Sequence, residues 1–355
     1  MTLSTAALAV TEGPRIARGY VMARVEDRMG RFLDEERARW IGVDSRAIIP
    51  VESIAALIGA GGKRLRPTFC VSGFLAAGGD LEDDTVVGAA VALEFLHACA
   101  LIHDDIMDDS PLRRGAPTVH TQYTAEHSKL GMRGEGRRYG ESVALLTGDL
   151  ALVYSDAMIG SCGSAARKVW DEARSELIIG QFLDMAAAAQ SLTDPELCRW
   201  IALCKSGRYT IDRPLALGAT LAGAPELVPA LSAYGLALGE AFQLRDDLLD
   251  VYGDPAVLGK PTGHDVDQHK MTLLLALAVQ RDESIRRMVA ESDGALGDPT
   301  VIRRLFADTR VLDDIEMHIG DLVRRARASI ADAPISDDWR QELADLALSV
   351  AYRDR

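Results

Sequence analysis

Residues 91–118 read VALEFLHACALIHDDIMDDSPLRRGAPT, a long apolar run that leads into a dense cluster of aspartates. The run over residues 91–102 has only Glu94 and His97 as strongly polar side chains and contains no glycine or proline, which favours a buried helix over a strand. Pro111 is expected to end this helix, because its ring removes a backbone donor and disfavours helix at the preceding residue. The stretch therefore predicts a buried helix with carboxylates at its end.

The aspartate cluster places two carboxylates on one side of the predicted helix. Asp104 and Asp108 lie one turn apart on the same face if the helix continues to about residue 109, whereas Asp105 points towards the flank. Two bare carboxylates at this spacing repel by roughly a few tenths of a kcal/mol, and by more where water is scarce. A cation would relieve the repulsion, and hard oxygen ligands favour Mg²⁺. Taken alone, the cluster also fits a solvated, acidic helix end.

A second aspartate-rich segment repeats this pattern. Residues 241–254 read AFQLRDDLLDVYGD, in which Asp246 and Asp250 again stand one turn apart and Gly253 closes the helix. Two helices that end in aspartate pairs facing a central cavity could hold several Mg²⁺ ions between them. A diphosphate is the natural guest of such a cluster, because it bridges metal ions and is itself highly charged.

The composition of the 355-residue chain points to an all-α fold. Ala and Leu dominate, aromatic residues make up only 5%, and the alternation of β-branched residues that marks strands is scarce. We expect a flexible tail over residues 1–15 and a single large helical domain over residues 16–355. Helices are predicted at 16–40, 50–59, 68–78, 84–103, 143–160, 165–189, 196–220, 271–291, 312–331 and 338–352.

Two segments between the helices are of interest. Residues 127–142 are polar and glycine-rich, and we expect a mobile loop there, a candidate lid. Residues 59–67 read GAGGKRLRP, in which glycines let backbone N–H groups approach an anion and Lys63, Arg64 and Arg66 supply positive charge. The segment lacks the GxxxxGK[ST] spacing of a phosphate-binding loop, and a basic surface turn at a helix start is the simpler alternative.

Charge and cysteine content limit the partners and the compartment. A net charge of −14 argues against a nucleic-acid surface, although bound metal ions would still allow a polyanionic substrate. The five cysteines show no CxxC spacing and no disulfide framework, which indicates a reducing, cytoplasmic environment. The N-terminal stretch lacks the basic start of a signal peptide. The most apolar segment is interrupted by Glu94 and His97, so stable membrane insertion is not expected.

Taken in order, the motifs resemble those of the trans-isoprenyl diphosphate synthases of the polyprenyl synthetase family, most closely the bacterial geranylgeranyl diphosphate synthases. Each matching segment is a weak signal alone, but the ordered set is specific. The segments are GKRLRP at 62–67, LEFLHACALIHDDIMDDSPLRRGAPTVH at 93–120, GQFLDM at 180–185, KSGRYT at 205–210, FQLRDDLLD at 242–250 and GDPAVLGKPTGHD at 253–265.

The resemblance implies a role for each matching residue. The diphosphate of isopentenyl diphosphate would be held by Lys63, Arg66, His97 and Arg114. The Mg²⁺ ligands would be Asp104, Asp108 and Asp246, with Asp250 completing the second pair. The allylic diphosphate would contact Arg113, Lys205, Lys260 and Lys270. Ser206 and Gln243 would lie near the allylic cation. The family more often has Thr at position 206, and Ser retains the hydroxyl.

The implied reaction is a Mg²⁺-dependent, head-to-tail condensation of isopentenyl diphosphate with an allylic diphosphate, through ionisation, condensation and proton elimination. The resemblance also implies three Mg²⁺ ions with the allylic diphosphate bound, and a homodimer. Two other classes of protein are alternatives to a condensing enzyme. A class I terpene cyclase normally lacks the second DDxxD and needs no isopentenyl site. A non-catalytic partner subunit usually loses one aspartate cluster or basic ligands, and this chain has both sets.

Product length is expected to depend on the helix that precedes Asp104. Cys99 and Ala100 are small, whereas short-chain members of the family carry a bulky aromatic floor at one of these positions. A deeper pocket is therefore expected, with Leu96, Phe95 or side chains from residues 181–188 as the floor and geranylgeranyl diphosphate as the product. Small residues at these positions also suit simple helix packing, and farnesyl and twenty-five-carbon products remain alternatives.

Overall fold

The computed structural model describes residues 13–160, 162–253, 270, 272–291, 308 and 310–353, and this part of the chain is helical apart from one short hairpin. The chain divides into two compact units. Unit 1 comprises Met1–Val71 and Asp80–Cys162, and unit 2 comprises Ser72–Gly79 and Gly163–Arg355. The all-α prediction is confirmed. The single domain expected over residues 16–355 stays a prediction.

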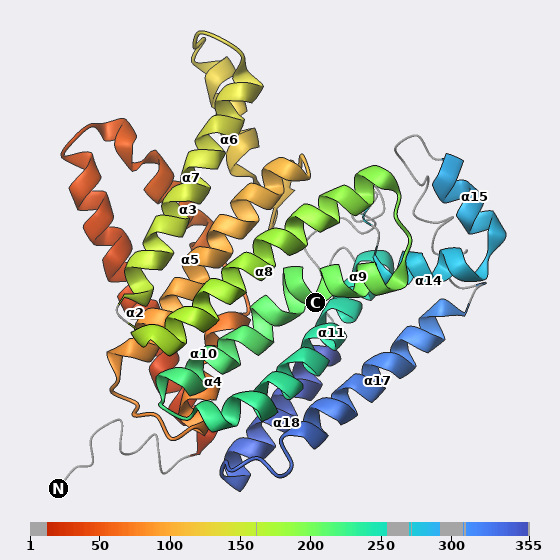
Figure 1. The fold of residues 1–355 in the computed structure, drawn as a ribbon. Helices are drawn as coiled ribbons and strands as arrows, with labels where there is room; N and C mark the ends of the chain where they lie inside the picture. The colour runs from red at the N-terminus through yellow and green to blue at the C-terminus, as the bar shows by residue number, and fades with distance from the viewer. Residues whose placement is uncertain are drawn as a thin grey trace, which may run out of the picture. The chain divides into compact units, whose positions relative to one another are not determined.

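Unit 1 contains the N-terminal helices and the first aspartate cluster (Figure 1). Its helices are α2 (Pro14–Ile41), η1 (Ser45–Ile48), α3 (Ile49–Gly59), the first part of α4 (Leu65–Ala76), α5 (Asp84–Met107), α6 (Val119–Lys129) and α7 (Gly136–Ile159). Helix α2 begins at Pro14, two residues inside the expected tail, and residues 1–12 of that tail lie outside the described residues.

Helix α5 forms the core of unit 1 and packs against α2, α3, α6 and α7 (Figure 1). It begins at an Asp83 cap, whose side chain accepts a 2.7 Å hydrogen bond from the Thr85 backbone N–H. Its apolar side chains are buried over most of its length, and each large one contributes roughly 1.5–3 kcal/mol. The helix ends at Met107, and the predicted buried helix with carboxylates at its end is confirmed.

A short hairpin follows α5. Strands β1 (Leu112–Arg113) and β2 (Ala116–Pro117) pair antiparallel, with Arg113 opposite Ala116. The two residues between the strands have positive φ angles, 53° at Arg114 and 76° at Gly115, which is the backbone geometry of a two-residue hairpin turn. The hairpin brings Arg113 back to the aspartates at the end of α5, and it brings Arg114 to the backbone oxygens of Leu57 and Gly61.

The lid expected at residues 127–142 is largely wrong, because α6 extends to Lys129 and α7 begins at Gly136. One glycine of this segment, Gly140, serves helix packing. A Cβ at Gly140 would overlap the backbone oxygen of His120 and the side chain of Thr124, so only glycine allows α7 to approach α6 this closely. Only residues 130–135 lie between the two helices.

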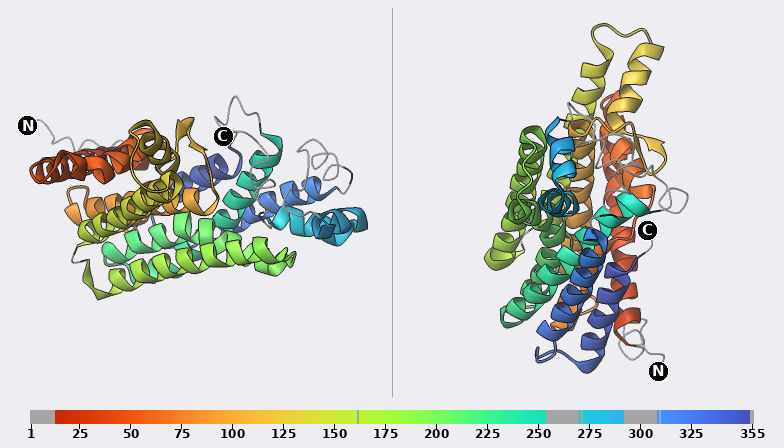
Figure 2. Two further views of the ribbon diagram at one scale, coloured as in Figure 1. Left: turned by 90° about the horizontal axis from the view of Figure 1, so that it is seen from above. Right: turned by 90° about the vertical axis from the view of Figure 1, so that its right-hand side faces the viewer.

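Unit 2 is built around α11 (Val228–Tyr252), which packs against η2 and along α17 (Figures 1 and 2). A Cβ at Gly207 or Gly239 would overlap the backbone of the other glycine, so this pair permits the close crossing of η2 and α11. The other helices are α8 (Gly163–Gln190), α9 (Pro195–Ala202), η2 (Leu203–Asp212), α10 (Arg213–Leu221), η3 (Pro225–Leu227), α14 (Leu273–Arg281), α15 (Glu283–Glu291), α17 (Val311–Ser329) and α18 (Asp337–Ala351).

Two predicted helices of unit 2 are interrupted. The helix expected at 196–220 is α9 and α10 joined by η2, a π-helical segment. The helix expected at 271–291 is divided at Asp282, whose backbone is extended and whose side chain caps the start of α15. Residues 254–265, which carry most of the GDPAVLGKPTGHD motif, lie outside the described residues.

The cysteines and the long apolar helices bear on two further predictions. Cys70, Cys99, Cys198 and Cys204 are buried and carry free thiols. Three helices of the described chain are long and apolar enough to cross a membrane by length and composition: α5, α7 and the segment Pro225–Tyr252. In α5, 72% of the most apolar window is buried by protein. The absence of membrane insertion stays a prediction.

Candidate active site

The first aspartate pair lies at the C-terminal end of α5. Asp108 caps the helix, and its backbone N–H donates a 2.8 Å hydrogen bond to the carbonyl of Asp104, so the two residues are one turn apart as predicted. Both are partly exposed, whereas Asp105 is buried and points away from them. Asp104 and Asp108 can therefore bind a ligand at this helix end.

Arg113, from the hairpin, is tied to the aspartate cluster. Its Nε donates a 2.7 Å hydrogen bond to Asp105, and its Nη2 lies 3.5 Å from Asp104. Burial raises the pKa of Asp105, although the hydrogen bond from Arg113 opposes this effect. Asp105 thus holds the predicted diphosphate ligand Arg113 beside the carboxylate pair.

The predicted isopentenyl diphosphate ligands lie around the basic turn and α5. Lys63 is exposed, while Arg66 and His97 are half-buried. Burial, and then the charge of Arg66 and of neighbouring arginines, lowers the pKa of His97 well below its usual value. Arg114 donates hydrogen bonds to the backbone oxygens of Leu57, at 3.1 Å, and Gly61. This concentration of positive charge suits an anion.

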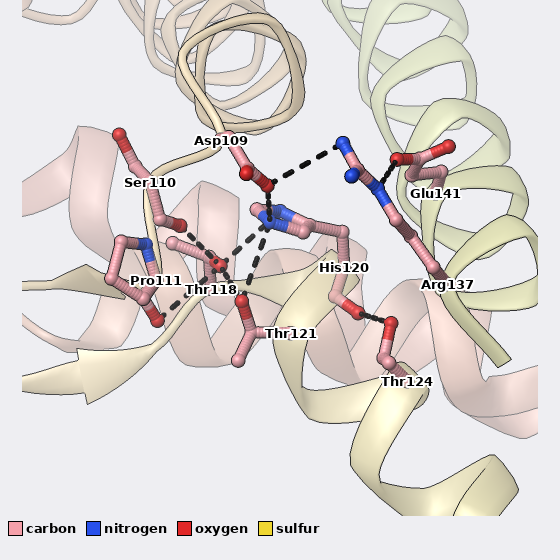
Figure 3. Close-up of polar contacts among 9 residues, drawn as sticks. All are labelled: Asp109, Ser110, Pro111, Thr118, His120, Thr121, Thr124, Arg137 and Glu141. Carbon is pink, nitrogen blue, oxygen red and sulfur yellow. Dashed lines mark hydrogen bonds and ion pairs between the residues drawn. The ribbon is translucent and has the colours of Figure 1, made fainter. Parts of the chain in front are cut away.

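The sequence assigned no role to several residues that support these groups. At the basic turn, Arg64 forms a 2.6 Å ion pair with the buried Glu94. Beyond α5, the Asp109 carboxylate lies between His120 and Arg137, 3.8 Å from each (Figure 3). These partners come from α6 and α7. Contacts of this kind leave no pattern in the sequence.

The predicted chain-length residues line one side of α5. Cys99 is buried and Ala100 half-buried, and burial raises the pKa of the Cys99 thiol to about 12, which leaves it a neutral, apolar group. One turn earlier, the Phe95 ring lies 5.5 Å from Phe32 and 5.7 Å from Tyr154, measured between ring centres. Phe32 and Tyr154, from α2 and α7, are additional bulky groups that the sequence did not indicate.

In unit 2, η2 presents Lys205 and Ser206, both half-buried. The Lys205 Nζ donates a 2.7 Å hydrogen bond to Asp184 of α8. The GQFLDM motif signalled Asp184, but no role was assigned to it. π-helical structure is rare and occurs frequently at functional sites.

The second aspartate-rich segment lies at the C-terminal end of α11. Gln243 donates a 2.8 Å hydrogen bond to Asp247. Asp246 is partly exposed and pairs with Arg353 near the C-terminus of the chain, whereas Asp250 is buried. The Arg353 guanidinium also lies over the Phe242 ring, 4.0 Å from its centre. Of the two predicted metal ligands in this segment, Asp246 is therefore accessible to solvent and Asp250 is not.

Two further lysines were predicted to contact the allylic diphosphate. Lys260 lies outside the described residues, and Lys270 is half-buried two residues before the Thr272 cap of α14. Their roles stay predictions.

The aspartate pairs suit Mg²⁺ by their chemistry. Mg²⁺ is usually held by one or two protein carboxylates, with water and substrate phosphates completing an octahedron. Among the described residues no group of three or more His, Cys, Asp or Glu side chains is arranged to hold a metal ion. Guanidinium groups lie beside Asp104 and Asp246, which demonstrates that both carboxylates attract cations. Asp104 with Asp108, and Asp246 in unit 2, would each hold an ion together with phosphate oxygens.

Fold and site together define an all-α protein with aspartate-rich helix ends and basic side chains suited to diphosphates. The polyprenyl synthetase family model matches residues 50–300. The chain belongs to this family, as a trans-isoprenyl diphosphate synthase, and is a prenyltransferase.

Individual relatives agree with this assignment. A short chain isoprenyl diphosphate synthase of Methanothermobacter thermautotrophicus is 36% identical over 63% of this chain; the chain spans 65% of that protein's length. The geranylfarnesyl diphosphate synthase of Aeropyrum pernix is 32% identical to this chain. The match covers 82% of this chain and 90% of the length of that protein. The crystal structure of geranylgeranyl pyrophosphate synthase from Corynebacterium glutamicum, complexed with isoprenyl diphosphate and magnesium, is similar with a TM-score of 0.88. It is 37% identical, over 94% of this chain and 98% of that one.

Proposed function

We propose that this protein condenses isopentenyl diphosphate with an allylic diphosphate, head to tail, and that its main product is geranylgeranyl diphosphate. One observation carries the proposal: α5 carries His97, which lies close enough to Arg66 and Arg114 to be affected by their charge, and carries the aspartate pair at its C-terminal end. His97 belongs to the purely basic group, and seven residues later Asp104 begins the group suited to metal ions. At 1.5 Å per residue the two lie about 10 Å apart along the helix. An enzyme with two diphosphate substrates needs both groups, whereas a terpene cyclase needs only the second.

The basic group binds isopentenyl diphosphate in this proposal. Lys63, Arg66 and Arg114 neutralise its diphosphate, and His97 donates a hydrogen bond as a neutral imidazole, in agreement with its lowered pKa. The homoallylic double bond is thereby held as the nucleophile. No covalent bond to the protein is formed.

The allylic substrate is ionised at the second group. Arg113, beside the first aspartate pair, is proposed to hold the diphosphate as the C–O bond breaks, and the motifs of the family assign the same role to Lys205 and Lys260. Preorganised charge of this kind can contribute roughly 100- to 1000-fold to the rate per donor. When bound, Mg²⁺ would neutralise further negative charge on the leaving diphosphate. Ser206 and Gln243 direct oxygen atoms towards the allylic cation.

Condensation then follows from charge. The isopentenyl double bond attacks the allylic cation, and a new carbon–carbon bond forms. The departing diphosphate accepts the proton that is lost, which restores a double bond one unit along. The residues given above therefore need to bind, orient and exclude water, and no side-chain base is required.

Product length is proposed from the side chains on α5. Cys99 and Ala100 are too small to stop a growing chain close to the metal-binding end. The ring cluster of Phe95, Phe32 and Tyr154 lies one turn further along and is proposed as the floor. Ring centres 4.9–5.7 Å apart leave no room for an alkyl chain between them.

We also propose a cytoplasmic homodimer without membrane insertion. Apolar side chains are exposed on single helices of each unit, and a protein partner would remove them from water. On α7 they are Leu145, Leu146 and Val153; on α8 they are Ile178, Ile179, Phe182 and Met185. A second copy of the chain is the proposed partner, and sedimentation of the purified protein would measure this.

The function is tested by incubating the purified protein with Mg²⁺, isopentenyl diphosphate and each allylic primer in turn, then identifying the alcohols released by phosphatase. Mainly geranylgeraniol is expected. Farnesol or a longer alcohol would retain the chemistry and overturn the proposed floor. A hydrocarbon formed from an allylic substrate alone would favour a cyclase, and no turnover would favour a non-catalytic partner subunit.

A further inference from the structure

The basic turn has a backbone that needs external support. Gly61 and Gly62 have φ angles of 89° and 155°, and Arg64 has a φ of 49°. A residue with a Cβ rarely adopts this left-handed conformation, because the Cβ approaches the neighbouring carbonyl oxygen. Arg64 therefore pays a conformational cost that its surroundings must offset.

The Arg64 side chain supplies that support from inside unit 1. Its Nη1 lies 2.6 Å from Glu94 and its Nε 2.8 Å from Glu26, while Nη2 donates a 3.1 Å hydrogen bond to the carbonyl of Ile58. The Glu94 side chain is only 5% exposed. Arg64 thus joins the end of α3, the turn itself and two other helices, α2 and α5.

Glu94 and the predicted substrate ligand His97 lie about one turn apart on the same helix. They are three residues apart on α5, so their side chains lie on neighbouring positions of one face. Lys63 and Arg66 lie within two positions of Arg64 along the chain. The Arg64–Glu94 ion pair therefore fixes the position of the basic turn relative to His97. Burial raises the pKa of Glu94 despite the charge of Arg64, so the pair is held in a strongly desolvated environment.

Arg114 reaches the same turn from the hairpin. It donates to the carbonyl of Gly61, and a Cβ at Gly62 would lie 3.0 Å from its Nη2. A side chain at position 62 would press on the Arg114 guanidinium, and the φ of 155° also favours glycine there. The turn is held between two arginines, Arg64 on the α5 side and Arg114 on the hairpin side.

We propose that Arg64 and Glu94 are positioning residues for the isopentenyl substrate. They do not bind it; they hold the turn so that Lys63, Arg66 and His97 meet a single diphosphate without rearrangement. This inference rests on the proposed function. It predicts that damage to the pair weakens the use of isopentenyl diphosphate selectively and leaves the allylic substrate unaffected, because Arg113 is held by Asp105 and Asp104, whereas Arg64 is held by Glu94 and Glu26.

The test measures KM for both substrates in two conservative variants. Arg64→Lys keeps the charge and loses the planar fork, and Glu94→Gln keeps the size and loses the charge. KM for isopentenyl diphosphate is expected to rise about tenfold, a loss typical of groups that orient ligands. KM for farnesyl diphosphate is expected to stay within about twofold, and kcat to change less than KM.

Two further variants keep the test decisive. Arg24→Lys alters another ion pair, with Asp84 at 2.7 Å, that also joins α2 to α5, and it should change neither constant. Removing one buried charge can prevent folding, so Arg64→Met combined with Glu94→Leu removes both charges together. This double variant should fold and show the same selective rise in KM.

Equal changes in both KM values, or no change in either, would overturn the inference and assign the pair a merely structural role. A parallel loss of thermal stability and of both substrates' use would do the same. If the wild-type protein consumes no isopentenyl diphosphate, the proposed function fails and this inference falls with it. Wild-type turnover with unaltered KM values in the variants would overturn this inference alone.

Discussion

The Nζ atom of Lys205 lies 2.7 Å from a carboxylate oxygen of Asp184, and this ion pair joins the π-helical segment η2 to α8 within unit 2. Both side chains are mostly buried, at 21% and 15% exposure. The pair therefore fixes the direction of the Lys205 ammonium group while keeping part of it open to a ligand. A diphosphate that approached Lys205 would meet a group already oriented and need not order it.

Substitution of Lys205 by Ala is expected to lower kcat roughly 100- to 1000-fold, because one preorganised charge on the leaving diphosphate is lost. Asp184→Asn should have a smaller effect, since Lys205 remains but loses its partner. Steady-state kinetics at saturating substrates measures both. Lys205→Arg is the control for charge, and a Lys205→Ala variant with wild-type kcat would contradict the role of Lys205.

Arg353 and Mg²⁺ are expected to compete for Asp246. The guanidinium pairs with Asp246 and stacks over Phe242, so a metal ion at Asp246 must displace the pair. Arg353→Ala should lower the Mg²⁺ concentration needed for half-saturation about two- to fivefold, the scale of a partly exposed ion pair. Mn²⁺ binding measured by electron paramagnetic resonance provides a readout that does not depend on turnover. Arg353→Lys should behave like the wild type, and an unchanged metal affinity in Arg353→Ala would be evidence against competition.

An aromatic residue introduced on α5 is expected to shorten the product. Ala100→Phe places a bulky ring two turns or less from the aspartate pair, above the ring cluster around Phe95. The main product should change from geranylgeranyl to farnesyl diphosphate, with turnover of the short primers retained. Mass spectrometry of the dephosphorylated products measures the change, and Ala100→Ser serves as the size-matched control. Retention of the twenty-carbon product would place the growing chain elsewhere.

The buried carboxylate of Glu36 makes stability depend on pH. One of its oxygens, Oε2, accepts 2.8 Å hydrogen bonds from the Tyr154 hydroxyl and from the Trp40 indole N–H. Burial alone would raise the Glu36 pKa, but these hydrogen bonds outweigh burial and lower it below its ordinary value of 4.5. The ionised form is thus favoured in the folded state, and its contribution is present above pH 4.5 and is lost as the pH falls through the lowered value.

Tyr154→Phe removes one of these donors and should cost about 1–3 kcal/mol of unfolding free energy at pH 7. The difference from the wild type should shrink as the pH is lowered below 4.5, because Glu36 becomes protonated. Urea unfolding across this pH range measures it. Tyr20→Phe removes a similar hydrogen bond, to the exposed Glu82, and should cost less than about 1 kcal/mol. A pH-independent penalty would contradict the assignment to Glu36.

Helices with long apolar runs were predictable from the sequence. The run before Asp104 and the run before Asp246 are long apolar stretches, and the structure buries both as helices. The order of the motifs then indicated the family. The helical fold and the family were therefore predicted correctly, whereas the roles of the aspartates and of the basic residues stay predictions.

Contacts between distant segments were not predictable. Gly140 reads as a loop residue, but it serves the close packing of α7 on α6. Tyr154 and Glu36 are separated by 118 positions, and Arg64 and Glu94 by 30, and nothing in either local sequence indicates the partner. The π-helical segment at Lys205 depends on its packing against α8 and α11 and has no local signature. Such features follow from tertiary structure, which outweighs local propensity.

The most direct test of the central claim follows radiolabelled isopentenyl diphosphate with farnesyl diphosphate as the primer, and counts the diphosphate released. Each condensation forms one carbon–carbon bond and releases one diphosphate. Label is expected to enter a twenty-carbon allylic product in a one-to-one ratio with the released diphosphate. A chelator of divalent ions should abolish both the incorporation of label and the release of diphosphate. Diphosphate release without incorporation of label would contradict it, because the allylic substrate would then ionise without condensing.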